Sequence, residues 1–214
     1  MRAFVAIPTL SRADLLIRNK GFLENIKTPD FALILDNGGN QKIDIDVPIV
    51  RSEKNLGVAE SWNMFLHRAF VADNFDLCVI LQDDIIWDAA RLESAKWLVE
   101  NRPDVDLFLS FLQFSVQVHR PTTIDKVGFF DTRFPGYAGD DDYAIRIAHS
   151  LNAFYERRAE LHPLPGSIIE GTPKPVPGGL AHRELLRKWG VKTFEINIPN
   201  APWYMTNRGV TFPT

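Results

Sequence analysis

The sequence predicts an α/β fold, an open and mostly parallel β-sheet flanked by helices within a single domain. Strand-like apolar runs alternate with helical patterns over residues 1–103, which is typical of such a sheet. The runs at 3–7, 31–35 and 77–81 are continuously apolar, as expected of strands that are buried on both faces. Polar residues follow each of these runs directly, and in a parallel sheet such residues meet at one edge.

Six strands are expected along the chain. They lie at 3–7, 31–35, 47–50, 77–81, 107–112 and 115–118. Pro8 ends the first strand, and the Asn-Gly-Gly sequence that begins at Asn37 allows the positive φ of a turn after the second. The longer intervals between the strands are the places where helices are expected.

Helices are expected where a capping residue precedes apolar residues at helical spacing. They lie after Ser11, at 57–72, between Asp88 and Pro103, at 140–150 and at 181–189. Ser11 and Asp14 match a capping box, and Asn55 and Asp88 can accept from the first backbone N–H groups of the next two helices. Gly190 is placed to end the last helix as its C′ residue.

The chain divides into a core at 1–160 and a loop-rich C-terminal extension at 161–214, which is expected to pack on the active site. Proline and glycine are frequent between 161 and 180, which predicts irregular structure there. Acidic residues outnumber basic ones over 1–150, and the reverse holds over 151–214. Two explanations fit this distribution. One is chance variation, and the other is an acidic metal site in the core with a basic tail near a phosphate-bearing ligand.

The composition is that of an ordinary globular protein, with 214 residues and a net charge of −3. The negative balance disfavours duplex DNA as a ligand, because binding DNA generally needs a basic face. The single cysteine, Cys78, lies in an apolar run, so no disulfide forms within the chain and its side chain is expected to be buried. Neither a signal peptide nor a run long enough to cross a bilayer is recognised, and we expect a cytoplasmic protein.

Asp83 and Asp84 directly follow the apolar run at 77–81. Two adjacent carboxylates repel each other, so a loop that holds them after a buried strand often binds a cation. Oxygen ligands suit Mg²⁺ or Mn²⁺, and Mg²⁺ typically bridges one or two carboxylates to the phosphates of a substrate. A solvated loop in which Asp84 only begins a turn explains the pair equally well.

A second acidic cluster, Asp140, Asp141 and Asp142, opens the helix expected at 140–150. Acidic residues in the first turn of a helix are favoured by its dipole, but one would suffice and three repel one another. The excess suggests a role for one of them as a general base or a metal contact.

Several motif classes are absent from the sequence. It has no G-x-x-x-x-G-K-[ST] phosphate loop, no G-x-G-x-x-G after the first strand and no G-x-S-x-G. One cysteine cannot build a cysteine-based zinc site. These absences disfavour phosphate-loop enzymes, dinucleotide-binding dehydrogenases and α/β-hydrolases.

Six segments, in order and at similar spacing, resemble the GT-A glycosyltransferases of family two, a large inverting group with a Rossmann-like fold. They are V-A-I-P-T-L-S-R at 5–12, L-D-N-G at 35–38, E-K-N-L-G-V-A at 53–59, L-Q-D-D-I at 81–85, V-G-F-F-D at 127–131 with Phe134, and G-D-D-D-Y-A-I-R at 139–146. Each segment alone is a weak match, but their order is fairly specific and they cover about residues 3–150. A later K-W-G at 188–190 is also similar to a segment of some relatives.

The resemblance implies a role for each polar strand end. Residues expected to hold a nucleotide-sugar donor are Pro8, Thr9, Arg12, Asp36, Asn55, Gly57 and Asp83. Among them, Asp36 is expected on the base. Asp84 is expected to bind Mn²⁺ or Mg²⁺, with His162 as a candidate further ligand. Asp140 is the expected general base, which removes a proton from the acceptor hydroxyl as the sugar is transferred with inversion.

Two positions depart from the family pattern. Gln82 replaces the first acid of the usual D-x-D metal motif, which lowers the expected metal affinity. Gly139 stands where relatives carry glutamate, so Asp141 is a rival to Asp140 as the base. A non-catalytic module that binds sugar nucleotides or glycans on the same fold is one alternative. A nucleotidyltransferase is another, although it would normally carry a glycine-rich loop after the first strand.

The acceptor stays open in this interpretation. A glycan, a lipid-linked sugar, a protein hydroxyl or, less favoured, a modified DNA base would each supply the required hydroxyl. The sequence does not distinguish among UDP, GDP and dTDP sugars as the donor.

Overall fold

A computed structural model describes residues 1–110, 113–134, 138–150 and 178–189. Its six strands are β1 (Ala3–Thr9), β2 (Phe31–Asn37), β3 (Ile49–Ser52), β4 (Leu77–Leu81), β5 (Leu107–Ser110) and β6 (Gln113–His119). They form one sheet in the order β3-β2-β1-β4-β6-β5. The pairs β1–β2, β1–β4 and β2–β3 are parallel, whereas β6 runs antiparallel to both β4 and β5. The expected open, mostly parallel sheet is therefore confirmed.

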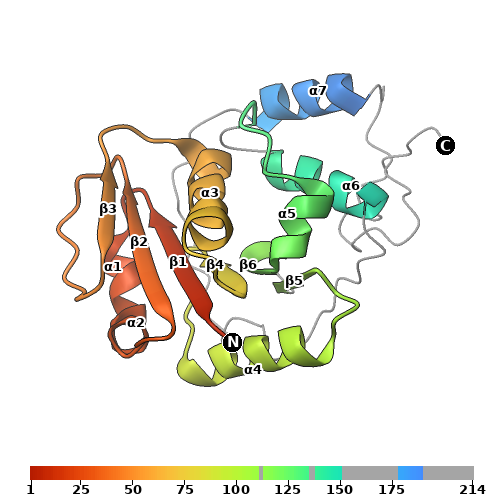
Figure 1. Cartoon of the computed structure of the whole chain (residues 1–214). Helices are drawn as coiled ribbons and strands as arrows, with labels where there is room; N and C mark the ends of the chain where they lie inside the picture. The colour runs from red at the N-terminus through yellow and green to blue at the C-terminus, as the bar shows by residue number, and fades with distance from the viewer. Residues whose placement is uncertain (111–112, 135–137, 151–177, 190–214) are drawn as a thin grey trace.

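Helices cover both faces of this sheet (Figure 1). The helical elements are α1 (Ala13–Leu16), η1 (Ile17–Asn19), α2 (Lys20–Glu24), α3 (Gly57–His67), η2 (Arg68–Ala72), α4 (Ala89–Asn101), α5 (Pro121–Val127), α6 (Gly139–Ser150) and α7 (Gly178–Trp189). One core cluster joins the sheet to α3, α6 and Leu185 of α7, and the other joins it to α1, α2 and α4. The sheet is the middle layer between these two cores.

Strand β1 shows why its sequence is apolar throughout. Phe4 and Ala6 belong to the core on the α3 side, while Ala3, Val5 and Ile7 belong to the core on the α4 side. Successive side chains of a strand point to opposite faces, so a strand covered on both faces needs apolar residues at every position. All five are fully buried.

Two of the expected caps are present in the structure. Asp88 accepts from the backbone N–H of Arg91 at 2.9 Å at the start of α4. Asn55 accepts from the backbone N–H of Gly57 at 2.8 Å, although Leu56 is the residue in the N-cap position of α3. Both side chains satisfy backbone donors that the helix itself leaves open.

The expected capping box at Ser11 is wrong. The residue in the N-cap position of α1 is Arg12, whose side chain makes no capping hydrogen bond, and the backbone N–H of Ala13 donates instead to Oε1 of Gln41 at 2.7 Å. Asp14 pairs instead with the Arg12 side chain, at 3.2 Å from Nε. A four-residue helix that passes at once into a 3₁₀ turn depends little on its cap, because its buried residues Leu15 and Leu16 anchor it to the core.

The helix α5 was not among the expected elements. It begins at Pro121, directly after the strand β6, and proline at the first helical position is a known start signal. The side chain of Thr123 in its first turn accepts from the backbone N–H of Arg120 at 3.3 Å.

Within the described part of the chain, no helix is both long and apolar enough to cross a bilayer.

Candidate active site

The parallel strands bring their polar ends to the same edge of the sheet. Thr9, at the end of β1, lies opposite Asp36 of β2 in the strand register. Strand β4, which leads into Gln82, Asp83 and Asp84, pairs with β1 on its other side. Three segments far apart in the sequence therefore converge at one edge, as the sequence predicted.

Asp83 and Asp84 are both partly buried beside Arg12 and Thr9. Burial raises the pKa of Asp83 to about 6, an effect that the nearby Thr9 hydroxyl opposes and the charge of Asp84 strengthens. Burial also raises the pKa of Asp84, against the favourable charge of Arg12. Within the described chain, Oδ1 of Asp84 is buried with no hydrogen-bond partner. Burial disfavours the charged form of both carboxylates, and a bound cation would reduce that cost.

Asp36 is fully buried and its carboxylate is occupied by partners within the chain. It accepts from the backbone N–H of Gln41 at 2.8 Å and of Gly39 at 3.2 Å, and it pairs with the guanidinium of Arg51. These contacts fold the loop after β2 back over the strand end. The expected contact of Asp36 with a nucleotide base stays a prediction.

The same loop lies against the segment that follows β1. A side chain at Gly39 would place its Cβ 2.0 Å from the backbone oxygen of Leu10, so only glycine fits there. At Gly38, φ is +87° and a Cβ would lie 2.5 Å from the backbone nitrogen of Asn55. The two glycines allow the loop after β2 to approach both neighbouring segments of the site.

Asn37 is a site residue that sequence reasoning did not single out. Its Nδ2 donates to Oδ1 of Asn55 at 3.1 Å, and its Oδ1 accepts from the backbone N–H of Leu56 at 2.8 Å. It thus fixes Asn55 and the start of α3 to the end of β2. The signal was available, because Asn37 is a polar residue that directly follows Asp36 at a buried strand end.

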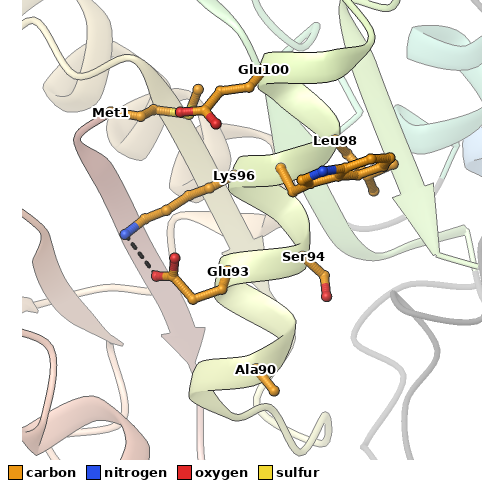
Figure 2. Close-up of a pocket in the computed structure, with 8 residues that line it drawn as sticks. Met1, Ala90, Glu93, Ser94, Lys96, Leu98 and Glu100 are labelled. Atoms are coloured by element: carbon orange, nitrogen blue, oxygen red, sulfur yellow. Dashed lines mark hydrogen bonds and ion pairs between the residues drawn. The ribbon is translucent and has the colours of Figure 1, made fainter.

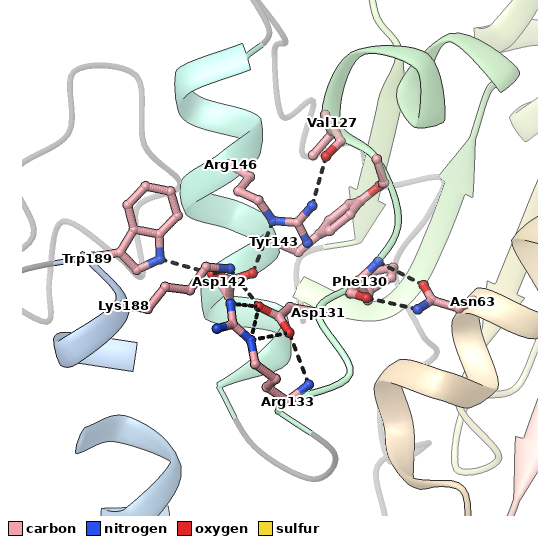
Figure 3. A network of polar contacts seen from close by, with 11 residues as sticks. Asn63, Val127, Phe130, Asp131, Arg133, Asp142, Tyr143, Arg146, Lys188 and Trp189 are labelled. Atoms are coloured by element: carbon pink, nitrogen blue, oxygen red, sulfur yellow. Dashed lines mark hydrogen bonds and ion pairs between the residues drawn. The ribbon is translucent and has the colours of Figure 1, made fainter. Parts of the chain in front are cut away.

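The three acidic residues at the start of α6 have different surroundings. Asp142 is fully buried and accepts from Arg146 Nε at 3.0 Å, Lys188 Nζ at 2.6 Å and Trp189 Nε1 at 2.9 Å. Figure 3 shows this network between α6 and α7. Asp141 is only 8% exposed, whereas Asp140 is half-buried. Asp142 therefore joins the helices α6 and α7.

A pocket of about 170 Å³ lies between α3, the end of β4 and the start of α6. We call it the α3–α6 pocket, and its lining residues are Val58, Ala59, Trp62, Gln82, Phe130, Phe134, Gly139 and Asp140. It joins Gln82, the neighbour of Asp83, to Asp140. The lining thus includes Asp140 of the second acidic cluster, but not Asp141, and it reaches the first cluster only through Gln82, the residue before Asp83.

The aromatic walls of this pocket were not expected from the sequence. Phe130 is held by Asn63, which donates to its carbonyl oxygen and accepts from its N–H, both at 2.8 Å (Figure 3). The ring of Phe130 stacks on Tyr143 at 3.8 Å between centroids. Pocket walls of this kind depend on packing between distant segments, which leaves no local signal.

A larger hollow, of about 760 Å³, lies along α4 beside Met1 (Figure 2). Met1 precedes β1, so this hollow adjoins the opposite end of that strand from Thr9. Its lysine, Lys96, is engaged by Asp30 at 2.6 Å and by Glu93 at 3.0 Å. Its place and its paired charges give no reason to connect it with the acidic clusters.

The remaining predicted site residues are placed as follows. Pro8 lies in β1 opposite Leu35, and Gly57 opens α3 with φ at +79°. His162 lies outside the described residues. Among the described residues, no group of three or more histidine, cysteine, aspartate or glutamate side chains is arranged to hold a metal ion. A metal at Asp84 would need further ligands from a substrate, from water or from the rest of the chain.

No protein-family model matches the chain, and no curated protein matches it. Solved structures do. A mannosyltransferase from Pyrobaculum calidifontis, in complex with GDP-Man and Mn²⁺, is 19% identical with a TM-score of 0.55, over 78% of this chain and 58% of that one. Glucosyl-3-phosphoglycerate synthase from Mycobacterium tuberculosis, in complex with Mn²⁺ and UDP-glucose, is 13% identical with a TM-score of 0.60, over 89% and 80%.

TarS from S. aureus is similar as well, at 11% identity and a TM-score of 0.54 over 72% of this chain and 57% of that one. All three are glycosyltransferases of one architecture. This chain has the GT-A fold. It spans less than two thirds of the TarS and mannosyltransferase chains that it matches. The structural similarity establishes the GT-A fold. At identities this low it does not establish an activity, which depends on the residues of the site.

Proposed function

We propose that this GT-A chain is a metal-dependent glycosyltransferase that transfers a sugar from a nucleotide-diphosphate donor to an acceptor hydroxyl with inversion. The observation that supports it most is the α3–α6 pocket, which joins the loop of Asp83 and Asp84 to Asp140. Structural neighbours bound to GDP-Man or UDP-glucose with Mn²⁺ add to this support.

Asp84 is suited to be the ligand that the protein supplies to a Mg²⁺ or Mn²⁺ ion. One of its oxygens is buried without a partner in the described chain, and burial raises the pKa of both Asp83 and Asp84. Mg²⁺ is commonly held by one or two carboxylates, with substrate phosphates and water as the other ligands. Bound there, the cation would neutralise charge that develops on the nucleoside diphosphate as it leaves. His162 remains the predicted further ligand.

The side chains of the strand ends suit the nucleotide half of the donor. Arg12 supplies positive charge next to Asp83 and Asp84, so it can face the same diphosphate. Asn55 and Gly57, fixed by Asn37, form the end of α3 at which the positive pole of the helix dipole lies. With Pro8, Thr9 and Asp36, these residues are our proposed nucleotide-binding set.

Asp140 is our proposed general base. An alcohol is a weak nucleophile at neutral pH, so a carboxylate that accepts its proton assists attack on the anomeric carbon. Asp140 lines the α3–α6 pocket, while Asp141 is more deeply buried and is not part of the lining. Attack from the side opposite the leaving diphosphate would invert that carbon.

The proposed function is tested first by the binding of nucleotides and then by the turnover of a nucleotide sugar. We expect one of UDP, GDP, dTDP and CDP to raise the thermal stability only with Mn²⁺ or Mg²⁺ present, because a ligand at 100 times its Kd adds about 2.7 kcal/mol. Asp84→Ala should lose the metal-dependent part of this shift. With the matching nucleotide sugar, Asp140→Asn should lower turnover by about 10²- to 10⁴-fold.

Asp141→Asn is the matched control for the base, and we expect it to lower turnover less than Asp140→Asn does. A metal-dependent nucleotide shift without turnover of any sugar nucleotide would favour a non-catalytic binding module. Absence of that shift with all four nucleotides would overturn the proposed function. Glycans, lipid-linked sugars and protein hydroxyls are the acceptors to screen once the donor is known.

A further inference from the structure

We propose that Gln41 is a positioning residue, which holds Arg12 where it can bind the diphosphate of the donor nucleotide. This inference rests on the proposed function, in which Arg12 faces that diphosphate. It concerns a side chain to which neither the polar strand ends nor the family resemblance gives a role. Gln41 lies in the loop at 38–48, between β2 and β3.

The side chain of Gln41 joins the loop after β2 to the start of α1. Its Oε1 accepts from the backbone N–H of Ala13 at 2.7 Å, and its Nε2 donates to Oδ1 of Asp36 at 3.3 Å. These two neighbours fix the orientation of the amide, because a flipped amide would bring its oxygen to a carboxylate and its nitrogen to another N–H donor. Gln41 therefore connects the end of β2 to the residue that follows Arg12.

Gln41 is itself held in place from the strand side. The buried carboxylate of Asp36 accepts from the backbone N–H of Gln41 at 2.8 Å and pairs with the guanidinium of Arg51. Arg51 also donates to the backbone oxygen of Gln41 at 2.9 Å. Gly39 packs closely on the side chain, since a Cβ there would lie 2.8 Å from Nε2 of Gln41. The backbone and the side chain of Gln41 are thus both fixed to the end of β2 before a ligand binds, which favours a specific site.

The hydrogen bond to Ala13 fixes the backbone of Arg12. The N–H of Ala13 lies in the same rigid peptide plane as the carbonyl group and the Cα of Arg12. The carbonyl oxygen in this plane accepts from the backbone N–H groups of Leu15 at 2.9 Å and Leu16 at 3.1 Å. The plane is therefore held at both edges, by Gln41 at its N–H and by α1 at its oxygen, and the Cα of Arg12 is held with it.

The backbone position of Arg12 matters because its guanidinium lies beside the proposed metal site. Its charge acts on both Asp83 and Asp84. Asp14 engages its Nε at 3.2 Å and its Nη2 at 3.3 Å, whereas Nη1 makes no hydrogen bond within the described chain. The guanidinium is thus oriented along one edge and has a further donor for a phosphate oxygen, a pairing that is typical of arginine.

Gln41→Met tests the inference, because methionine has a similar length and makes no comparable hydrogen bonds. The matched control is Glu24→Met. Oε1 of Glu24 accepts from the backbone N–H of Asp46 at 2.9 Å, so it ties the same loop to the end of α2 instead of to the residue next to Arg12. Calorimetry with Mn²⁺ measures the affinities of UDP, GDP, dTDP and CDP for the wild type, for both variants, for Arg12→Met and for the double variant Gln41→Met/Arg12→Met.

For the nucleotide that binds the wild type, Gln41→Met should lower the affinity about two- to tenfold, and Glu24→Met should leave it unchanged. Arg12→Met should lower it about tenfold or more, as expected for a hydrogen bond to a charged group. The double variant should bind as tightly as Arg12→Met within about twofold, because a residue that acts through Arg12 has no further effect once Arg12 is removed. A residue that only stabilises the loop would instead give losses that add.

Three results would overturn the inference while the proposed function survives, provided that the wild type binds a nucleotide. They are equal affinities of Gln41→Met and Glu24→Met, losses that add in the double variant, and an unchanged affinity in Arg12→Met. Circular dichroism checks that each variant is folded, and Gln41→Asn, whose amide is one methylene too short to reach both partners, replaces Gln41→Met if that variant does not fold. If the wild type binds none of the four nucleotides, the proposed function fails and the inference fails with it.

Discussion

At the scale of single residues, the site contains carboxylates whose charged form is destabilised by burial. Asp83 lies between Asp84 and the hydroxyl of Thr9, mostly out of water, and its pKa rises to about 6 from 3.8. Between these two values the folded chain binds more protons than the unfolded chain. The free energy of unfolding therefore decreases as the pH rises through this range, and it stays lower above it.

Asp83→Asn removes this cost, so we expect the variant to be more stable than the wild type above about pH 6. A shift of roughly two pKa units at ~1.4 kcal/mol each sets an upper limit, and partial solvation reduces it to about 1–2 kcal/mol. The difference should vanish below about pH 4. Urea unfolding as a function of pH, with a chelator present, measures it.

Asp104→Asn is the control, because it should act in the opposite direction. The Arg102 side chain lowers the pKa of the exposed Asp104, so its loss should lower stability slightly at neutral pH. If Asp83→Asn also lowers stability at pH 7.5 without metal, the carboxylate is not strained by its burial. Its interpretation as half of a cation site would then lose its basis.

The sequence was sufficient to find the residues that end the strands but not their partners. Asp83, Asp84 and Asp36 could be predicted because a charged residue after a buried strand is a local signal. The ion pair of Asp36 with Arg51 could not be predicted, nor could the N–H of Trp62, which has no partner among the described residues. Both depend on residues brought together by the fold, and no spacing in the sequence encodes them.

At the scale of elements, α7 is fastened to α6 through one buried carboxylate. The ammonium group of Lys188 lies between Asp142 and Asp131, and Asp142 also accepts from Arg146 and Trp189 (Figure 3). The pKa of Asp131 is lowered by Arg133 and by Lys188. Helix α7 thus supplies positive charge beside the acidic start of α6.

Lys188→Met should lower the free energy of unfolding by about 1–3 kcal/mol. A buried ion pair that loses one partner costs about 3–5 kcal/mol, and Arg146 and Trp189 remain to offset part of the loss at Asp142. Arg187→Met on the same helix is the control. Its side chain is 82% exposed and lies 3.9 Å from Glu184, so its effect should stay within about 0.5 kcal/mol.

Urea unfolding of the two variants at pH 7 makes the comparison. Equal stability of the Lys188 and Arg187 variants would contradict the interpretation that this ion pair joins the helices. The sequence predicted a helix at 181–189 from its periodicity, and α7 confirms it with an earlier start. It could not predict which carboxylate that helix would meet, because its expected start at residue 181 lies 41 residues after the start expected for the other helix at residue 140.

At the scale of the whole molecule, the order of the strands builds the site. Strand β1 lies between β2 and β4, so the ends of three parallel strands adjoin, and the loop between α5 and α6 brings Phe130 and Phe134 toward α3. Alternation of strand and helix predicted this topology for the first 103 residues. The antiparallel return of β6 and the short α5 decide where Asp140 lies, and the sequence carried only weak signals for them.

The two cores also predict how stability is distributed along the chain. Every described member of both core clusters lies between residues 3 and 147 except Leu185. A chain that ends at Ser150 keeps all six strands and should therefore still unfold cooperatively. Burial of Leu185 is worth about 1.5–3 kcal/mol, and loss of Lys188 and Trp189 from Asp142 adds to it.

We expect this shortened chain to be less stable than the full chain by at least about 3 kcal/mol, and less stable than Lys188→Met. Urea unfolding followed by circular dichroism and by tryptophan fluorescence, with coincident transitions, tests cooperativity. A broad or probe-dependent transition would mean that α7 completes the core rather than covering it. In that case the boundary predicted at residue 160 would divide one folding unit, and the residues after it would belong to the same domain as the site.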